Sequence, residues 1–245
     1  MFTKKVNSSL EPGSEESRRQ RGRPSGRTSQ GHEMRRRLYE TAIQMIGERG
    51  YEATTLRDVA RAEGVSVGLL YRYFPSKRAV VLGLYDELSA EYAARAMQMP
   101  ARKWRERFIF AMRTCLEVLR PYRNTLSALR PVLLGKDEES LFADKTAFSR
   151  RRVEAVFVAA VEKATDAPGS RLSEALGRLL YLLHLAVILW WLFDQTPKQR
   201  ATDALVALIE KILPSFGVAL LLPQVRGFVR SADELVRAGL FGEGE

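Results

Sequence analysis

From Met34 onward, apolar residues recur every three or four positions, which is the period of an amphipathic α-helix. No window of the sequence alternates between apolar and polar residues strongly enough to predict a strand. Glycine and proline residues interrupt the helical pattern at intervals. The pattern therefore predicts an all-α fold of about nine or ten helices.

The first four predicted helices have recognisable ends. Thr55, with Asp58 three positions later, is typical of a capping box, and Ser66 and Ser76 can cap the two helices that follow. Gly50 and Gly64 are natural C-terminal stops, and Pro75 disfavours helix at the residue before it. These signals predict helices over 34–50, 55–64, 66–74 and 76–97.

The remaining chain is helical by the same period, with prolines and glycines between the segments. The acidic run Asp137-Glu138-Glu139 is typical of a solvated helix start near Gly135. The predicted segments are 102–119, 122–134, 138–165, 170–194, 198–221 and 224–238.

Within the segment 170–194, residues 176–193 are apolar nearly all round and are therefore expected to be buried. Its longest apolar run is shorter than the ~20 residues of a membrane span and contains His184, so we predict a core helix and no membrane partner. Residues 204–222, with Pro214 as an expected kink, are its predicted partner. Two such helices from each of two subunits would form a four-helix interface, and a purely intrachain core is the alternative.

Charge is distributed unevenly along this layout. Residues 1–80 hold 16 Lys and Arg against 9 Asp and Glu, a net charge of +7, which leaves +3 of the total of +10 for the rest. A basic excess favours a polyanionic partner, either nucleic acid or an acidic membrane surface, although a generally basic protein gives the same total. Its concentration in the first third favours nucleic acid.

The helix at 66–74 separates into two faces on a helical wheel. Leu70 and Phe74 lie on the core side, whereas Arg72 points directly away from them, on the same outer side as Gly68 and Leu69. An arginine can read guanine in the major groove, an apolar side chain can contact a thymine methyl, and a glycine lets the helix lie close to DNA.

Four further residues complete this DNA-reading pattern. Tyr71 and Tyr73 flank the outer face, where their hydroxyls can reach phosphates, and Lys77 is placed to hold a backbone phosphate. Arg57 faces outward from the preceding helix, which would cross the DNA backbone. Two helices joined by a glycine turn are common in all-α proteins, so the side chains rather than the shape favour DNA binding.

The stretch "TTLRDVARAEGVSVGLLYRYFPSK", residues 54–77, resembles the DNA-binding domain of the TetR family of bacterial transcriptional repressors. The resemblance covers residues 32–92, including "MRRRLYETAIQMIGERGYEATT". It implies a three-helix N-terminal domain, a larger helical domain that binds a small-molecule effector, and a homodimer on a palindromic operator. Carried over by position, the implied DNA-binding residues are Thr55, Arg57, Ser66, Val67, Gly68, Leu69, Tyr71, Arg72, Tyr73 and Lys77.

We therefore divide the chain into three parts. Residues 1–31 are polar and basic and are predicted to be a flexible arm, 32–92 are the DNA-binding domain with its helix-turn-helix at 55–74, and 93–245 are the effector-binding and dimerisation domain. In the arm, Arg21 and Arg23 form a slim basic hook that fits an A·T-rich minor groove, although a solubilising tail has the same composition.

An effector pocket is expected to be apolar with few polar groups. His184 is a lone polar residue in an apolar helix, and a core histidine bonded to a carbonyl is the alternative. Each candidate can equally be plain core. The candidates are Trp104, Phe108, Met112, Tyr122, Phe148, His184 and Trp190.

Enzyme chemistry and cofactors are not expected. The single cysteine, Cys115, excludes an intrachain disulfide, and the two histidines, His32 and His184, form no evident metal or Cys–His cluster. The N-terminus has no apolar secretory region, so a cytoplasmic location is expected. The leading hypothesis is a ligand-responsive dimeric repressor. The alternatives are a sequence-tolerant architectural DNA-binding protein, or a helical ligand carrier or enzyme.

Overall fold

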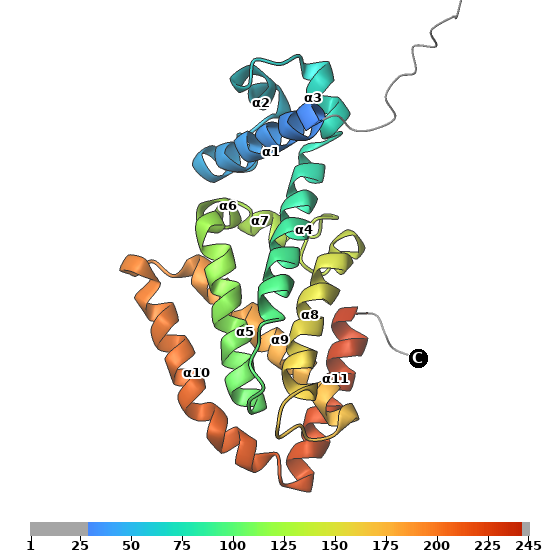
Figure 1. Ribbon diagram of the computed structural model, residues 1–245, viewed down its shortest axis with the longest axis vertical. Helices are drawn as coiled ribbons and strands as arrows, with labels where there is room; N and C mark the ends of the chain where they lie inside the picture. Colours follow the sequence, from blue (N-terminus) through green and yellow to red (C-terminus); the bar gives the residue numbers. More distant parts are fainter. Residues whose placement is uncertain (1–28, 242–245) are drawn as a thin grey trace, which may run out of the picture.

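The computed structural model describes residues 29–241, which form eleven α-helices and three short 3₁₀ helices. No strand occurs within this range, so the all-α prediction is confirmed. The helices form a small N-terminal domain and a larger C-terminal domain, joined by one long helix that belongs to both (Figure 1). Two predicted DNA-arm residues, Arg21 and Arg23, lie outside the described range.

The N-terminal domain consists of α1 (Ser29–Arg49), α2 (Leu56–Ala62) and α3 (Val67–Tyr73). It lies at the upper end of the molecule, and α4 (Lys77–Ala96) runs from it into the C-terminal domain (Figure 1). Each helix contributes its apolar face to one small core. The most deeply buried side chains of this core are Leu38, Ile46, Val59, Leu70, Phe74, Val80 and Leu84.

The predicted caps are confirmed. The hydroxyl oxygens of Thr55, Ser66 and Ser76 accept hydrogen bonds from the backbone N–H three residues later, at 3.2, 3.1 and 3.1 Å. Gly50 and Gly64 adopt positive φ angles of 92° and 66°, as expected of residues that end helices. Because such caps satisfy otherwise unpaired N–H groups, they fix where α2, α3 and α4 begin.

The start of α1 differs from the prediction. The helix begins at Ser29 rather than Met34, so residues 29–31 are helical instead of belonging to the arm. Arg36 pairs with Glu33 at 2.8 Å and with Glu40 at 2.7 Å along the polar face. Pairs at these spacings support a helix, and the apolar pattern alone does not detect them.

The C-terminal domain is built around α5 (Trp104–Leu119), α8 (Ala147–Glu162) and α9 (Ser170–Phe193), with the lower part of α4 packed against them (Figure 1). Helices α8 and α9 approach very closely at Gly177, where a Cβ atom would lie only 2.5 Å from Val158 Cα. Phe108, Phe157 and Tyr181 fill the centre of this domain. The apolar helix predicted over 176–193 therefore packs on the core with one face. The expectation that it is buried all round is wrong, because Leu183, Trp190 and Phe193 are exposed.

Two further helices lie on the outside of this core. Helix α10 (Arg200–Ala219) contacts α5 and α9, and α11 (Pro223–Phe241) packs on α9 after a bend of 115°. The Arg178 guanidinium in α9 donates two hydrogen bonds of 2.6 Å to the Asp233 carboxylate in α11. By length and apolar character α9 could cross a membrane, as could the bent α10–α11 pair taken as one span, yet α9 packs against α5, α8, α10 and α11 of the protein itself.

The predicted helix over 122–134 is wrong because it is broken in two. After a 3₁₀ turn, η1 (Arg120–Tyr122), the chain forms α6 (Arg123–Ala128) and α7 (Arg130–Leu133). Pro131 has no N–H for the carbonyl of Ser127, which an unbroken helix would require. The Arg130 side chain supplies the missing donor, with its Nε 2.9 Å from that carbonyl oxygen.

The predicted helix over 138–165 is wrong in its first turns. Residues 134–143 form a loop, followed by η2 (Asp144–Thr146), and α8 begins only at Ala147. The Thr146 hydroxyl lies 2.8 and 2.9 Å from the carbonyl oxygens of Ser140 and Ala143, and the Leu141 N–H donates to the Leu133 carbonyl at 2.9 Å. These bonds satisfy the backbone without a helix.

The acidic residues of this loop also differ from expectation. Glu139, predicted to be a solvated helix start, is only 2% exposed. Its Oε1 lies 2.8 Å from Nε of Arg78, at the beginning of α4. Sequence patterning could not reveal this pair, because its partners are far apart along the chain.

Candidate DNA-binding surface and effector cavity

The outer face of α3 is formed by residues that do not contribute to the core. Val67, Gly68, Tyr71 and Arg72 are exposed, and the space around Gly68 is empty within 4 Å of an added Cβ. Leu70 on the opposite face is fully buried, as predicted. The helix can therefore present this face to a partner without disturbing the core.

Two of the predicted DNA-binding residues are less exposed than the helical wheel indicates. Leu69 and Tyr73 are half-buried, and Tyr73 packs against the core of the domain. Val67, by contrast, is 37% exposed, so it lies on the outer surface of the helix. The short helix is thus rotated slightly from the ideal geometry, and apolar contact can come from Val67 as well as Leu69.

Arg57 and Arg72 are the two exposed guanidinium groups of the predicted reading surface. Neither makes a hydrogen bond or ion pair within residues 29–241. The neighbouring Arg61, in contrast, is 3.2 Å from the Asp58 carboxylate. Arg57 and Arg72 therefore have all their donors available for an anionic or guanine-bearing partner.

Three of the predicted DNA-binding residues, at the ends of the helices, already have local partners. The Thr55 hydroxyl lies 2.5 Å from Asp58 Oδ2, and the Ser66 hydroxyl accepts from the Leu69 N–H. The Lys77 ammonium donates to the Tyr51 carbonyl and lies 3.9 Å from the centroid of the Tyr51 ring. An ammonium has three donors, so a phosphate contact by Lys77 stays possible beside this structural one.

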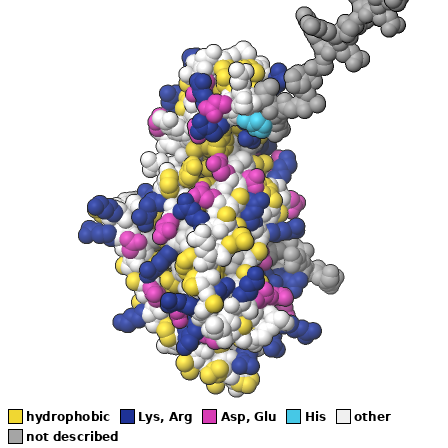
Figure 2. Space-filling view, viewed as in Figure 1, with side chains coloured by type: hydrophobic (Ala, Val, Ile, Leu, Met, Phe, Trp, Pro, Cys, Tyr) yellow, Lys and Arg dark blue, Asp and Glu magenta, His cyan; other side chains and the backbone are white. Residues whose placement is uncertain are grey.

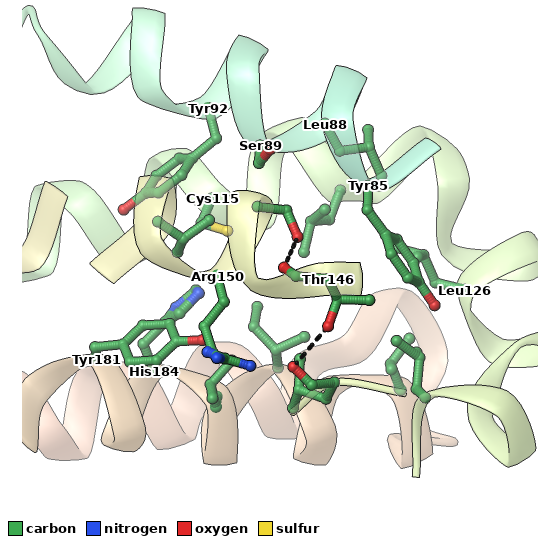
Figure 3. Close-up of a pocket in the computed structure, with 18 residues that line it drawn as sticks. Tyr85, Leu88, Ser89, Tyr92, Cys115, Leu126, Thr146, Arg150, Tyr181 and His184 are labelled. Carbon is green, nitrogen blue, oxygen red and sulfur yellow. Dashed lines mark hydrogen bonds between the residues drawn. The ribbon is translucent and has the colours of Figure 1, made fainter. Parts of the chain in front are cut away.

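A cavity of about 150 Å³ lies inside the C-terminal domain, between α4, α5, α8 and α9 (Figure 3). Its lining is mostly leucine and tyrosine, and Arg150 is the one formally charged side chain among the lining residues. The lining residues are Tyr85, Leu88, Ser89, Tyr92, Cys115, Leu119, Leu126, Leu133, Leu141, Thr146, Ser149, Arg150, Val153, Tyr181, His184, Leu185, Ile188 and Leu192.

Several polar atoms of this lining are buried without a hydrogen-bond partner in the described part of the chain. They are the hydroxyls of Tyr85 and Tyr92 and Nδ1 of His184. Burial lowers the pKa of His184 to about 3, so its imidazole is neutral at physiological pH. The ring of Phe157 lies 4.7 Å from that imidazole, centroid to centroid. Because unpaired buried polar groups are uncommon, they favour a cavity that accepts polar atoms of a ligand.

Of the seven predicted pocket residues, the structure places only His184 on this cavity. Trp104, Phe108 and Met112 are buried in the core of the C-terminal domain, on the same face of α5 as the lining residues Cys115 and Leu119 but closer to the start of the helix, beyond the cavity. Tyr122 lines a polar groove of about 710 Å³ between the two domains. Phe148 and Trp190 are exposed, at 40% and 50%. Apolar character alone could not show which way each side chain points.

Sequence analysis missed the tyrosines and the arginine of the cavity. Tyr85, Leu88 and Tyr92 are spaced three and four residues apart in α4, so they share one helical face. That spacing could have indicated the cavity. An aromatic face on the part of a helix that lies outside the DNA-binding core must pack on something else. Tyr181 and Arg150 gave no comparable signal, because their placement depends on how α8 and α9 pack.

A second apolar region lies on the outer sides of α9 and α10. Leu183 and Trp190 of α9 and Leu208 and Ile212 of α10 are exposed, and an apolar groove of about 310 Å³ runs between the two helices. Exposed hydrophobic side chains also gather at the lower end of the molecule, where α10 meets α11 (Figure 2). Val218, Leu221 and Leu222 are exposed there.

Comparison with known sequences points to one family. A family model described as "Bacterial regulatory proteins, tetR family" matches residues 38–84, which include the whole helix-turn-helix. The repressor KstR2 of Rhodococcus jostii is 38% identical over 73 residues, or 28% of this chain and 36% of the relative. The repressor KstR of the same organism is 35% identical over 75 residues, or 31% and 35%. The alignments thus span about a third of these relatives.

Solved structures resemble the fold over most of the chain. A tetR-family regulator from Streptomyces coelicolor superposes with a TM-score of 0.56 at 21% identity, covering 86% of this chain and 94% of the other. A TetR regulator from Nitrosomonas europaea gives 0.55 at 19% identity, covering 73% and 96%. At these identities the likeness concerns the fold, and it extends into the C-terminal domain.

Proposed function

Since the chain belongs to the tetR family of bacterial regulatory proteins, we propose that it is a DNA-binding transcriptional repressor that a small apolar effector releases from its operator. The observation that carries this proposal is the outer face of α3, where Arg72 and Tyr71 are exposed beside Gly68 and no described residue pairs with Arg72. The proposal places the protein in the cytoplasm, where its DNA would be.

Recognition would use the two helices of the motif differently. Helix α3 would enter the major groove, with Arg72 reading a base edge and Val67 or Leu69 contacting a thymine methyl. Arg57 of α2 would contact the adjoining backbone or a base near it, and Tyr71 a phosphate. Because Gly68 offers no donor, arginine contacts, apolar contacts and DNA shape would supply most of the specificity.

We further propose that the protein is a homodimer that binds a palindromic operator. The exposed apolar side chains of α9 and α10 would form a four-helix interface with the same helices of a second copy. The two α3 helices must then lie about 34 Å apart, one turn of DNA, to reach successive major grooves. Replacing Leu208 and Ile212 together by glutamate should give a monomer in sedimentation experiments. A variant that stays dimeric would contradict this interface.

The proposed effector site is the cavity between α4, α5, α8 and α9. Its apolar lining and neutral His184 favour a largely apolar molecule with one or more oxygen or nitrogen atoms that pair with the tyrosine hydroxyls and the imidazole. Its volume of about 150 Å³ is below the ~300–1,000 Å³ usual for ligand pockets, so effector binding would require the cavity to expand.

Fluorescence anisotropy with labelled DNA tests the main proposal. The purified full chain is titrated with duplexes from the region upstream of its own gene and with shuffled duplexes of equal composition. A preference for one upstream sequence at about 0.15 M salt, lost in Arg72→Ala and Tyr71→Ala, is expected. Equal affinity for all duplexes would instead favour an architectural DNA-binding protein, and no binding would favour a helical ligand carrier.

A further inference from the structure

The loop formed by residues 134–143 lies between the cavity and the DNA-binding domain. On one side Leu141 of this loop, with Leu133 before it and Thr146 after it, lines the cavity (Figure 3). The loop is closed at its base by the Leu141–Leu133 backbone hydrogen bond and by the Thr146 hydroxyl. A displacement of these lining residues is therefore expected to move the whole 134–143 loop.

On its other side the same loop contacts the first turn of α4. The Glu139 carboxylate lies 2.8 Å from Arg78 Nε, and Glu138 lies 3.7 Å from the same guanidinium. Glu138 also lies 2.5 Å from the Lys145 ammonium. Glu138 is exposed, whereas Glu139 is 2% exposed, so of the two carboxylates only Glu139 is buried beside Arg78.

Because Glu139 is buried, its carboxylate must stay close to the Arg78 guanidinium. Its Oε1 accepts no aligned hydrogen bond from the described residues, so the contact with Arg78 is an ion pair alone. A buried carboxylate that loses its partner becomes an uncompensated charge, which is strongly unfavourable. The loop and the start of α4 are therefore expected to move together or to separate completely.

The start of α4 is in turn rigidly connected to the recognition helix. Helix α3 ends at Tyr73 and α4 begins at Lys77, so only three residues join them. Ser76 caps α4, and the neighbouring Lys77 side chain binds the Tyr51 carbonyl between α1 and α2. A shift of the first turn of α4 must therefore change the orientation of α3.

We propose that the Glu139–Arg78 ion pair is a latch that holds the recognition helix in its DNA-binding position, and that an effector opens it from the cavity side. The inference rests on the effector-binding function proposed above. A molecule larger than the cavity must displace one wall, and the 134–143 loop is the wall without helical structure. Its displacement separates Glu139 from Arg78, and α3 loses the fixed placement that operator binding requires.

Hydrogen exchange of the full chain tests the latch directly. In Glu139→Gln, amide exchange in residues 74–80 and 134–143 is expected to accelerate on the order of tenfold, because both segments lose their shared restraint. Glu138→Gln is the matched control, since it removes the neighbouring exposed carboxylate, and exchange in residues 74–80 should stay as in the wild type. Equal exchange in residues 74–80 in all three proteins would overturn the proposal.

A second variant covers the case in which Glu139→Gln does not fold. Arg78→Gln changes a side chain that is 53% exposed and opens the same pair. By itself it should accelerate exchange in residues 74–80 as Glu139→Gln is expected to do. Where both single variants fold, the double variant should accelerate exchange no more than either one, because the same interaction is lost in each. Additive effects would show that the two residues act separately and would overturn the latch.

Occupation of the cavity can be imitated without an identified effector. Leu185→Trp enlarges a side chain on the α9 wall and should speed exchange in residues 74–80 in the wild-type background but not further in Glu139→Gln. No change at 74–80 in Leu185→Trp, with folding verified by thermal unfolding, would overturn the route from the cavity.

Operator affinity separates this inference from the proposed function. Glu139→Gln should bind the upstream duplex roughly tenfold more weakly than Glu138→Gln, within the range of typical coupling free energies. If the wild type binds no duplex, the proposed function is wrong. The hydrogen-exchange experiments still show whether the Glu139–Arg78 pair restrains the start of α4. If the wild type binds and Glu139→Gln binds equally well, the latch fails and the proposed function stands.

Discussion

Helices α3 and α9 each contain a glycine, and the two glycines serve opposite purposes. Gly177 of α9 lies against the backbone of Val158, so its missing side chain lets two core helices approach closely. Gly68 of α3 faces empty space, so its missing side chain leaves the surface bare for a partner. Gly177 thus permits close helix packing inside the C-terminal domain, whereas Gly68 keeps the outer surface of α3 accessible to a partner.

Gly177→Ala should give the largest change in stability. Its Cβ would lie 2.5 Å from Val158 Cα, and because this is backbone, α8 and α9 must move apart. Such overpacking typically costs 1–3 kcal/mol, and we expect a loss of about 3 kcal/mol in the free energy of unfolding. Chemical denaturation measures it. A variant as stable as the wild type would show that the α8–α9 contact is less tight than the distance indicates.

Arg72→Ala should reduce operator affinity by about 2 kcal/mol, roughly 30-fold, while stability changes by less than about 0.5 kcal/mol. Arg72 is exposed and its guanidinium makes no hydrogen bond or ion pair within the described residues, so only the DNA complex loses such an interaction. Arg95→Ala is the control, because Arg95 is exposed in α4 and pairs with Glu91 away from α3. Similar losses in both variants would mean that net charge alone is responsible.

His184 should make the C-terminal domain sensitive to acid. Its pKa is about 3 in the folded protein and near 6.5 when unfolded, so the unfolded state binds more protons below pH 6.5. The neutral histidine therefore costs nothing above about pH 6.5, and stability falls as pH decreases towards 3. Between pH 7.5 and 5.5 the expected loss is about 1.4 kcal/mol.

The same titration in His184→Phe isolates this contribution. The carboxylates and the exposed His32 are common to both proteins, so their effects cancel in the difference. The wild type should lose more stability than the variant over this pH range. Parallel pH profiles would show that His184 is protonated in the folded state or finds a partner there.

Gly68→Ala should give the smallest effect, and with the opposite sign to Gly177→Ala. No atom lies within 4 Å of the added Cβ, and alanine favours helix, so stability should rise by about 0.5 kcal/mol. Operator binding should weaken, because the new methyl group lies on the face that approaches DNA. Unchanged operator affinity in Gly68→Ala would mean that the DNA contacts another part of α3.

The caps show what could be predicted from sequence. Thr55, Ser66 and Ser76 each bond to a backbone N–H three residues away, so the necessary information is local and the boundaries of α2 to α4 were predicted closely. The outward direction of Arg57 and Arg72 was predicted for the same reason, since one helical period decides it.

The cavity and the latch could not be predicted in this way. Glu139 is buried only because Arg78 reaches it from a distant part of the chain, and an acidic run next to a glycine otherwise indicates a solvated turn. Trp190 and Phe108 look equally apolar in sequence, yet one is exposed and the other buried, because α9 has a face that no helix within residues 29–241 covers.

Thr125 of α6 lies at the contact between the two domains. Its hydroxyl lies 3.1 Å from the Ile43 carbonyl oxygen of α1, and a Cβ at position 47 would lie 2.8 Å from that hydroxyl. A larger side chain at Gly47 would therefore require Thr125, or α6 with it, to shift. When DNA-binding domains are exchanged between related proteins, by recombination or in the laboratory, the new domain must keep a glycine at the position of Gly47. A larger residue there would change the angle between the DNA-binding domain and the C-terminal domain.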